Sequence, residues 1–322
     1  MIDTDMSAKP GLFDLSDERG VLRTSIAMTL MVSALGIGFG LIAGSFSILF
    51  DGVYSLVDAS MSLLSLLVVN LITSYAASKK LPRRLHERFS VGFWHLEPMV
   101  LGLNGTLLIG VAIYALFNAI SSLLEGGRDL EFDWAIVYAV ITLIVCAVTA
   151  VVETRANRGI DSDFVRLDVK GWVMSAGITG ALLIAFCMGY GIQDTKWQWV
   201  SPYIDPSVLT LVCLLLIPLP VATVRQAMAD IFLVTPADLK SHIEEVARAF
   251  VDKHGFVSHR AYVARVGRSK DIELYFIVPA DAPARHIREW DALREEVGAA
   301  IGGEGPDRWL TIVFTGDPAW AD

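Results

Sequence analysis

Charged residues are scarce in this chain of 322 residues: 19% of positions are charged, 54% are hydrophobic, and the mean hydropathy is +0.53. Soluble domains have about 25% charged and about 45–50% apolar residues, so this composition excludes a soluble globular enzyme and favours a protein surrounded by lipid. The formal net charge of −9 argues against nucleic acid as a partner, because binding it requires a basic surface. Cysteine is almost absent as well. The few cysteines all lie inside apolar runs, which excludes a disulfide framework and a CxxC-type zinc site; they are Cys146, Cys187 and Cys213.

Long apolar runs are abundant. A transmembrane helix needs about 20 mostly apolar residues, because the hydrocarbon core is about 30 Å thick and each helical residue rises about 1.5 Å. Residues 1–22 carry acidic residues without a basic region or a cleavage site, so we expect an N-terminal cytoplasmic segment and no signal peptide. The sequence therefore predicts an integral membrane protein with a six-span transmembrane domain over residues 23–227. The six runs lie near 23–43, 46–77, 98–124, 133–155, 165–190 and 206–227.

Lys and Arg distinguish the two sides of the predicted bundle. The connections on one side carry only Arg128 and Lys196, whereas those after the second and fourth runs are strongly basic. By the positive-inside rule, the basic side faces the cytoplasm, which predicts a protein of the plasma (inner) membrane with both termini cytoplasmic. The basic residues on that side are Lys79, Lys80, Arg83, Arg84, Arg88, Arg155, Arg158 and Arg166.

From residue 236 onward the pattern is that of a soluble domain. Apolar residues recur at helical spacing between Asp238 and His254, and a turn at 267–270 separates two strand-like segments. A second helix near 284–300 and a last strand over 309–314 complete an α-β-β-α-β order. This order favours a small ferredoxin-like α/β domain over residues 236–322. The predicted fold class is a membrane all-α six-helix bundle plus a small α/β cytoplasmic domain.

The second run contains two acidic residues, Asp51 and Asp58. A charged side chain at the bilayer centre costs about 3 kcal/mol even on a lenient scale, so such residues are functional candidates. Seven residues turn an α-helix by about 700°, which places both carboxylates on one face, with Tyr54 between them. The sequence therefore predicts a stripe of oxygen groups that faces the interior of the bundle.

The fifth run repeats this spacing. Asp168 and Ser175 are seven residues apart, with glycine where the second run has tyrosine. Two such helices facing each other could surround a cation. The alternative is that Asp51 and Asp168 cap helix ends, or that they pair with Lys170 or Arg166 near an interface.

Several segments resemble the cation diffusion facilitator family, also called the cation efflux family. The segment from Ser45 to Asp58 is similar to the family's second-helix signature. The segment 89–98, which includes Glu97, is similar to the glycine-and-glutamate element before the third helix, and Asp205 begins a segment similar to the start of the sixth helix. With the six spans and the α-β-β-α-β tail, the resemblance covers nearly the whole chain.

The resemblance implies a homodimeric, proton-coupled antiporter that exports a divalent metal cation. In that family, two side chains of the second helix and two of the fifth hold the metal at mid-membrane. They correspond here to Tyr54, Asp58, Gly171 and Ser175. Only Asp58 keeps the ligand typical of the zinc-transporting relatives, and Gly171 offers no side chain.

Histidine is missing from all six runs. Zinc sites draw mainly on imidazole and thiolate, so a site built from Asp58, Tyr54, Ser175, Asp51 and Asp168 would contain only oxygen ligands. Oxygen sites suit harder cations, so we expect Mn²⁺, Mg²⁺ or Fe²⁺ to be favoured over Zn²⁺. A carboxyl group in a low-dielectric bundle tends to hold a proton when the site is empty, so cation binding would release protons.

The tail carries a further candidate metal set. His286 and Asp317 match two cytoplasmic zinc ligands of the family, and His259 is a near neighbour that could complete them. The alternative is that these are solvated surface side chains without a metal.

Three functions from different classes remain open at this point. The leading hypothesis is cation/proton exchange through the oxygen-rich site. The second is a transport-incompetent family member that acts as a scaffold or heterodimer partner. The third, a membrane enzyme, is disfavoured because the sequence offers no nucleophile–base pair or cofactor loop. For transport, we expect small residues to allow close helix packing; these are Gly102, Gly105, Gly177 and Gly180.

Overall fold

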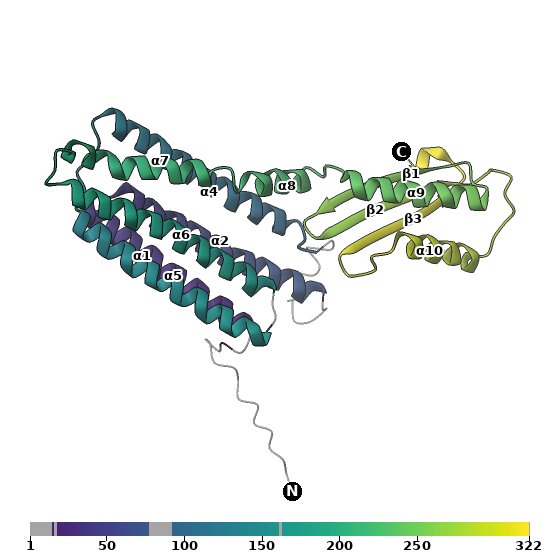
Figure 1. Ribbon diagram of the computed structural model, residues 1–322. Coiled ribbons are helices and arrows are strands. Elements are labelled where there is room, and N and C mark those ends of the chain that lie inside the picture. Colours follow the sequence, from purple (N-terminus) through teal and green to yellow (C-terminus); the bar gives the residue numbers. More distant parts are fainter. Residues whose placement is uncertain (1–14, 16–17, 77–91, 161–162, 322) are drawn as a thin grey trace, which may run out of the picture. The chain divides into compact units, whose positions relative to one another are not determined.

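The computed structural model describes residues 15, 18–76, 92–160 and 163–321 (Figure 1). The N-terminal two-thirds is helical. It comprises α1 (Glu18–Ala43), α2 (Phe46–Ala76), α4 (Leu96–Leu124), α5 (Phe132–Ile160), α6 (Asp163–Ile192), the 3₁₀ helix η1 (Gln198–Tyr203), α7 (Ile204–Leu216) and α8 (Val221–Ile231). The tail comprises α9 (Ala237–His254), β1 (Ser258–Val266), β2 (Ser269–Ile277), α10 (Ile287–Ile301), β3 (Arg308–Thr315) and η2 (Pro318–Ala321).

Six helical segments of the described chain are long and apolar enough to cross a membrane, which confirms the predicted spans. They are Gly20–Ala43, Phe46–Ile72, Leu96–Leu124, Phe132–Ile160, Asp168–Ile192 and Gln198–Ile231. The last span is interrupted between α7 and α8 at residues 217–220, because Pro218 and Pro220 cannot donate helical hydrogen bonds. The basic residues between 79 and 88, on which the predicted orientation depends, lie outside the described residues, as do residues 1–14.

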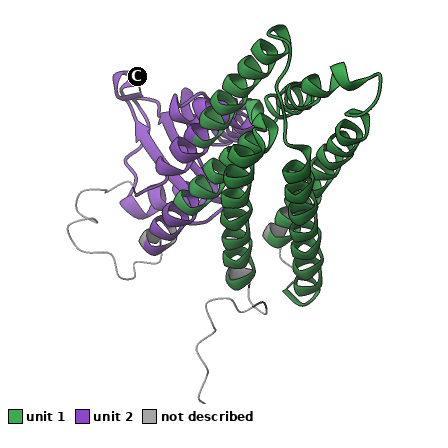
Figure 2. Cartoon of the chain, turned by 90° about the vertical axis from the view of Figure 1, so that its left-hand side faces the viewer, with its two compact units in different colours: residues 1–64, 104–222 green, residues 65–103, 223–322 purple. Residues whose placement is uncertain are grey.

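The chain forms two compact units, residues 1–64 with 104–222 and residues 65–103 with 223–322 (Figure 2). The division falls within α2, α4 and α8. In the first unit, α5 packs against both α6 and α1. Tyr138 of α5 and Phe186 of α6 are completely buried in the core that these helices share.

Helices α1 and α2 approach each other closely in the first unit. A Cβ atom added at Gly36 would lie 2.8 Å from the Cα atom of Gly52, too close for any side chain. The Ser33 hydroxyl donates a hydrogen bond of 2.7 Å to the carbonyl oxygen of Gly52 across the same contact. Glycine is therefore required at 36 and 52 for these two helices to pack as they do.

The prediction of close packing at Gly177 and Gly180 is wrong. A Cβ atom added at either glycine would meet no atom of the described residues within 4 Å. At Gly102, by contrast, it would meet the end of the Met228 side chain at 2.9 Å. A small residue in an apolar run does not reveal which face of the helix it occupies, so the sequence could not distinguish these cases.

The tail domain, part of the second unit, confirms the predicted α-β-β-α-β order and fold class. Its sheet has the order β1-β2-β3, with β1 and β2 antiparallel and β2 and β3 parallel. Alternate residues of β2 are buried, which places them on the sheet face covered by α9 and α10. This core contains Ile243, Ala247, Phe250, Phe256, Val263, Ile272, Leu274, Phe276, Leu293, Val297 and Ile301.

Glu97, at the start of α4, contacts the β1–β2 turn within the second unit. Its Oε1 atom accepts a hydrogen bond of 2.8 Å from Nε of Arg268. Gly267 in this turn has φ +61°, and a Cβ atom there would lie 3.0 Å from the other oxygen of Glu97. The glutamate of the predicted third-helix element thus contacts the tail sheet.

Candidate cation-binding site

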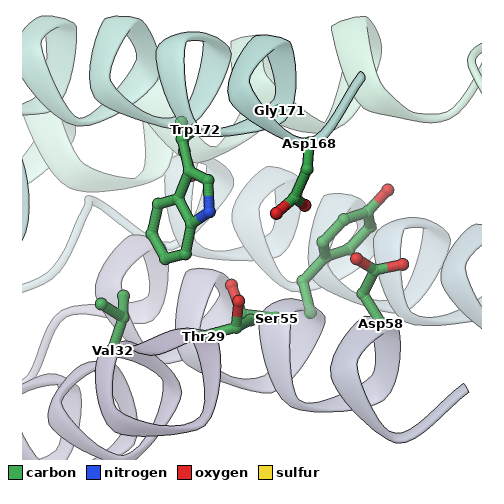
Figure 3. A pocket seen from close by; sticks show the side chains of 9 residues that line it. Thr29, Val32, Ser55, Asp58, Asp168, Gly171 and Trp172 are labelled. Carbon is green, nitrogen blue, oxygen red and sulfur yellow. The ribbon is translucent and has the colours of Figure 1, made fainter. Parts of the chain in front are cut away.

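A cavity of about 170 Å³ opens between α1, α2 and α6 in the first unit (Figure 3). Because one water molecule occupies about 30 Å³ of liquid volume, the cavity has room for a cation with several waters. Its wall consists mostly of polar groups, although it lies in helices that cross the membrane. The lining residues are Thr29, Val32, Tyr54, Ser55, Asp58, Asp168, Gly171, Trp172 and Ser175.

Helix α2 contributes Tyr54, Ser55 and Asp58 to this cavity. The three- and four-residue spacings of a helix bring these side chains to one face, as the sequence predicts for Tyr54 and Asp58. Asp58 also forms a hydrogen bond with Asn104 of α4, which orients its carboxylate. Figure 3 shows the carboxylates of Asp58 and Asp168 reaching into the cavity from different helices.

Helix α6 contributes Asp168, Gly171, Trp172 and Ser175. The Asp168 carboxylate interacts electrostatically with that of Asp58, and its Oδ2 atom is buried without a hydrogen-bond partner among the described residues. At Gly171 a Cβ atom would meet nothing within 4 Å in the described chain, so the glycine leaves this wall open. Two acids from separate helices therefore face one space.

Asp51 lies outside this cavity. It accepts a hydrogen bond of 2.6 Å from the Tyr138 hydroxyl of α5. It lines a neighbouring cavity of about 80 Å³, which shares Tyr54, Ser55 and Ser175 with the first. Seven residues advance a helix by about 10 Å, so Asp51 and Asp58 share a face of α2 but open onto successive cavities.

The ligand groups around the larger cavity are oxygen atoms. Its two carboxylates are accompanied by hydroxyl groups, and no imidazole or thiol lines it. The thiol of Cys146, on α5, does not line the cavity but forms a hydrogen bond with Ser175, which does. Among the described residues, no group of three or more His, Cys, Asp or Glu side chains is close enough to hold a metal. A cation here would therefore need hydroxyl, backbone or water oxygens in addition to the two acids.

Sequence reasoning missed several polar residues of this site. Asn104 could have been found, because it is an amide in the middle of an apolar run. Thr29 and Ser55 carried no such signal, since single hydroxyl residues are common in membrane helices and can bond to their own backbone. The Thr29 hydroxyl does so, with the Ser25 carbonyl oxygen at 3.0 Å.

Asp205, in the segment that resembles the start of the family's sixth helix, has a structural role. It is 3% exposed, and its carboxylate accepts hydrogen bonds from the Ser45 hydroxyl at 2.6 Å and the Phe46 backbone N–H at 3.0 Å. The Ser47 N–H lies 3.4 Å away. Asp205 thus caps the N-terminus of α2, where free N–H groups and the helix dipole favour an anion.

The three candidate metal ligands of the tail have separate partners. His259 Nε2 lies 2.8 Å from Oε2 of Glu244. The backbone N–H of His286 donates to the Glu289 carboxylate at 2.7 Å at the start of α10, and Asp317 accepts from the backbone N–H of residue 319. They therefore do not form a metal-binding group. The described part of the chain contains no group of three or more His, Cys, Asp or Glu side chains that could hold a metal.

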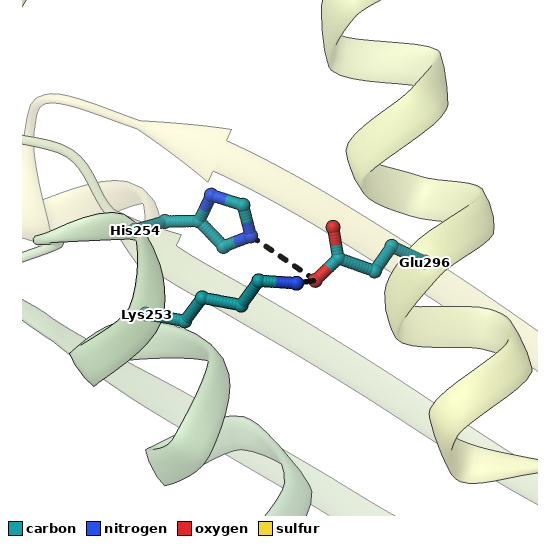
Figure 4. A network of polar contacts seen from close by, with 3 residues as sticks. All are labelled: Lys253, His254 and Glu296. Atoms are coloured by element: carbon teal, nitrogen blue, oxygen red, sulfur yellow. Dashed lines mark hydrogen bonds and ion pairs between the residues drawn. The ribbon is translucent and has the colours of Figure 1, made fainter.

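Glu296, another acidic residue of the tail, contacts two basic side chains (Figure 4). Oε1 of Glu296 in α10 accepts a hydrogen bond of 2.9 Å from Nζ of Lys253 and lies 3.1 Å from Nε2 of His254, both in α9. These two hydrogen bonds, the one from Lys253 foremost, lower the pKa of Glu296 below its ordinary value of 4.5. The contact joins the two helices that cover the sheet.

Comparison with known families agrees with this architecture. No curated protein matches the chain. The family model described as "Cation efflux transmembrane domain" matches residues 22–232, which is more than half of the 322 residues and covers the six spans except for the first two residues of the first span. Members of this family are transporters of divalent metal cations and not enzymes. This chain, with two acids facing one cavity between its membrane helices, belongs to the cation efflux family.

Proposed function

We propose that the chain exports a divalent cation in exchange for protons through the cavity between α1, α2 and α6. The observation that carries this proposal is that Asp58 and Asp168, from two helices, line one polar cavity. A charged carboxylate within a bilayer is energetically costly, so two carboxylates that face one cavity favour the binding of a cation there. Tyr54 and Ser175 line the same cavity and complete the proposed ligand set, with Asp51 in the adjoining one.

The ligand chemistry favours a hard cation. Mg²⁺ and Mn²⁺ prefer carboxylate, hydroxyl and water oxygens, whereas zinc sites use imidazole and thiolate. Gly171 and Ser175 correspond to the fifth-helix ligand positions, and neither offers a nitrogen or sulfur atom. We therefore propose Mn²⁺, Mg²⁺ or Fe²⁺ in preference to Zn²⁺.

Exchange with protons follows from the same two acids. Two carboxylates in one low-dielectric cavity repel each other, so the cavity favours positive charge, which protons can supply when the divalent cation is absent. A divalent cation neutralises both charges and displaces those protons. The same two side chains thus bind either the divalent cation or the protons, but not both at once.

The remaining features of the proposal concern the whole molecule. We propose a homodimer in the plasma (inner) membrane with both termini in the cytoplasm, as the distribution of basic residues and the family resemblance suggest. Residues 23–227 would form the transport domain, residues 236–322 the cytoplasmic domain, and residues 1–22 a cytoplasmic segment.

Flux measurements on reconstituted protein test this function. Proteoliposomes would report Mn²⁺ with one dye and internal pH with another, after a pH gradient is imposed. We expect the wild type to move Mn²⁺ against protons and Asp58→Asn to abolish both fluxes. Asp194→Asn, which neutralises an exposed acid in the connection after α6, is the matched control and should leave both fluxes intact.

Two results would contradict the proposal. Full Mn²⁺ flux in Asp58→Asn would remove this residue from the site. Wild-type protein that moves none of Mn²⁺, Mg²⁺, Fe²⁺ and Zn²⁺ would instead support the alternative of a transport-incompetent scaffold or heterodimer partner.

A further inference from the structure

Glu153 is a buried acid that does not line the cation cavity. It lies on α5 with only 1% of its surface exposed. Neither of its carboxylate oxygens has a hydrogen-bond partner among the described residues. An unpaired buried carboxylate costs several kcal/mol, so this side chain requires a proton or a cation.

The groups that face Glu153 come from two other helices. They are Asp168 and Trp172 of α6 and Ser25 of α1. The indole N–H of Trp172 already donates to the Ser25 hydroxyl at 2.8 Å. Asp168 leaves its own Oδ2 atom buried and without a partner. Two carboxyl groups, each with at least one oxygen that lacks a hydrogen-bond partner among the described residues, therefore lie next to each other between α5 and α6.

Other acids of the same unit have hydrogen-bond partners within the chain. Asp205 accepts hydrogen bonds from Ser45 and from the backbone of α2, and Asp51 accepts one from Tyr138. A structural acid in this bundle is thus supplied with donors. Around Glu153 the neighbouring donors are the Ser25 hydroxyl and the Trp172 indole, and neither meets full hydrogen-bond geometry with its oxygens, which leaves this acid able to bind a cation.

Asp168 connects Glu153 to the cation cavity. Asp168 and Trp172 line that cavity, whereas Glu153 and Ser25 lie beyond it. Two carboxylates and a serine hydroxyl can supply about five oxygen atoms, and a hard divalent cation takes about six, with water for the remainder. The arrangement therefore has the donor atoms of a cation site.

We propose that Glu153 and Asp168 bind a second cation at a position beside the cavity of Asp58, and that the Asp168 carboxylate contributes to both positions. This inference rests on the proposed function, because it gives the transported cation a second place to bind. A cation could then move between Glu153 and Asp58 without leaving the carboxylate of Asp168.

The number of bound ions tests this proposal. Purified full-length protein is titrated with Mn²⁺, and free Mn²⁺ is measured by electron paramagnetic resonance. We expect Glu153→Gln, which keeps the shape of the side chain, to lose one Mn²⁺ equivalent per chain relative to wild type. Asp58→Asn should also lose one and keep the other. Glu125→Gln, which neutralises an exposed acid after α4, is the control and should lose none.

The outcomes separate this inference from the proposed function. Unchanged stoichiometry in Glu153→Gln overturns the second position and leaves the first intact. Loss of all Mn²⁺ in both variants also overturns it, because a single site would then contain both acids. Wild-type protein that binds no Mn²⁺ contradicts the proposed function itself.

A second measurement needs no substitution at Glu153 and so does not depend on the folding of that variant. A hydrophobic carbodiimide labels buried carboxyl groups, and mass spectrometry locates the label. We expect Mn²⁺ to suppress labelling of Glu153 in wild type and also in Asp58→Asn. Labelling that Mn²⁺ does not change would show that Glu153 and Asp168 only share a proton, and would overturn the proposal.

Discussion

Two groups of acids in the first unit are held in opposite ways. Asp205 and Asp51 accept hydrogen bonds from hydroxyl or backbone groups that the chain supplies. Asp168 and Glu153 leave buried oxygens without partners among the described residues, and Asp58 faces a cavity. All lie in or beside membrane helices, where an unpaired charge is costly. We propose that this difference distinguishes acids that stabilise the fold from acids that bind a cation.

The largest expected effect on stability is that of Asp205→Ala. It removes the acceptor for the Ser45 hydroxyl and for the backbone N–H of Phe46, which stay buried. We expect a loss of about 2–4 kcal/mol in the free energy of unfolding, measured by titration with a denaturing detergent. Mn²⁺ flux per folded molecule should be retained. Normal stability with abolished flux would break the comparison, because Asp205 would then act as a site residue.

Tyr138→Phe tests the other satisfied acid with a smaller change. It deletes the hydroxyl that donates to Asp51 at 2.6 Å and leaves the rest of the ring in its core. We expect a loss of about 1–2 kcal/mol in the same unfolding measurement. Mn²⁺ affinity should change little. A loss of affinity as large as that of Asp58→Asn would place Asp51 among the primary cation ligands.

The ion preference of the cavity offers a way to sharpen the comparison. Gly171→His combined with Ser175→Asp adds an imidazole and a carboxylate to the α6 wall, where Gly171 has open space. We expect the preference for Zn²⁺ over Mn²⁺ to rise at least about tenfold, or about 1.4 kcal/mol, in competition flux assays. An unchanged ion profile would contradict the assigned ligand positions.

The smallest effect is expected at an exposed acid. Glu296 has a lowered pKa, so its contacts with Lys253 and His254 stabilise the tail above the ordinary glutamate range and are lost as the pH falls below it. Because the Glu296 side chain is 38% exposed, solvent screening limits the contribution to below about 0.5 kcal/mol. Hydrogen exchange of α9 and α10 should therefore be slightly faster in Glu296→Gln than in wild type at pH 7, and equal at pH 3. A difference that persists at pH 3 would exclude the ion pair as its cause.

Much of the fold could be predicted from the sequence. Hydropathy gave the six spans because a membrane helix must be long and apolar, and periodicity gave the tail order because its helices and strands each bury one face. Helical spacing also predicted that Tyr54 and Asp58 share a cavity, because both lie on α2 and their relation depends on that helix alone.

Relations between helices could not be predicted in the same way. The partner of Asp51 is Tyr138, which is 87 residues away, and nothing local marks that pair. Asp205 caps α2 from 159 residues away for the same reason. Glu153 did carry a signal, as an acid at the end of an apolar run, but only the packing of α5 against α6 reveals that it meets Asp168.

The central claim is that Asp58 and Asp168 share one cation. A double-mutant cycle of Mn²⁺ affinity, with Asp58→Asn, Asp168→Asn and the combined variant, tests it directly. If both acids bind the same ion, the two losses should differ from additivity by at least about 1 kcal/mol. Losses that add to within about 0.5 kcal/mol would show that the acids act independently and would contradict the account.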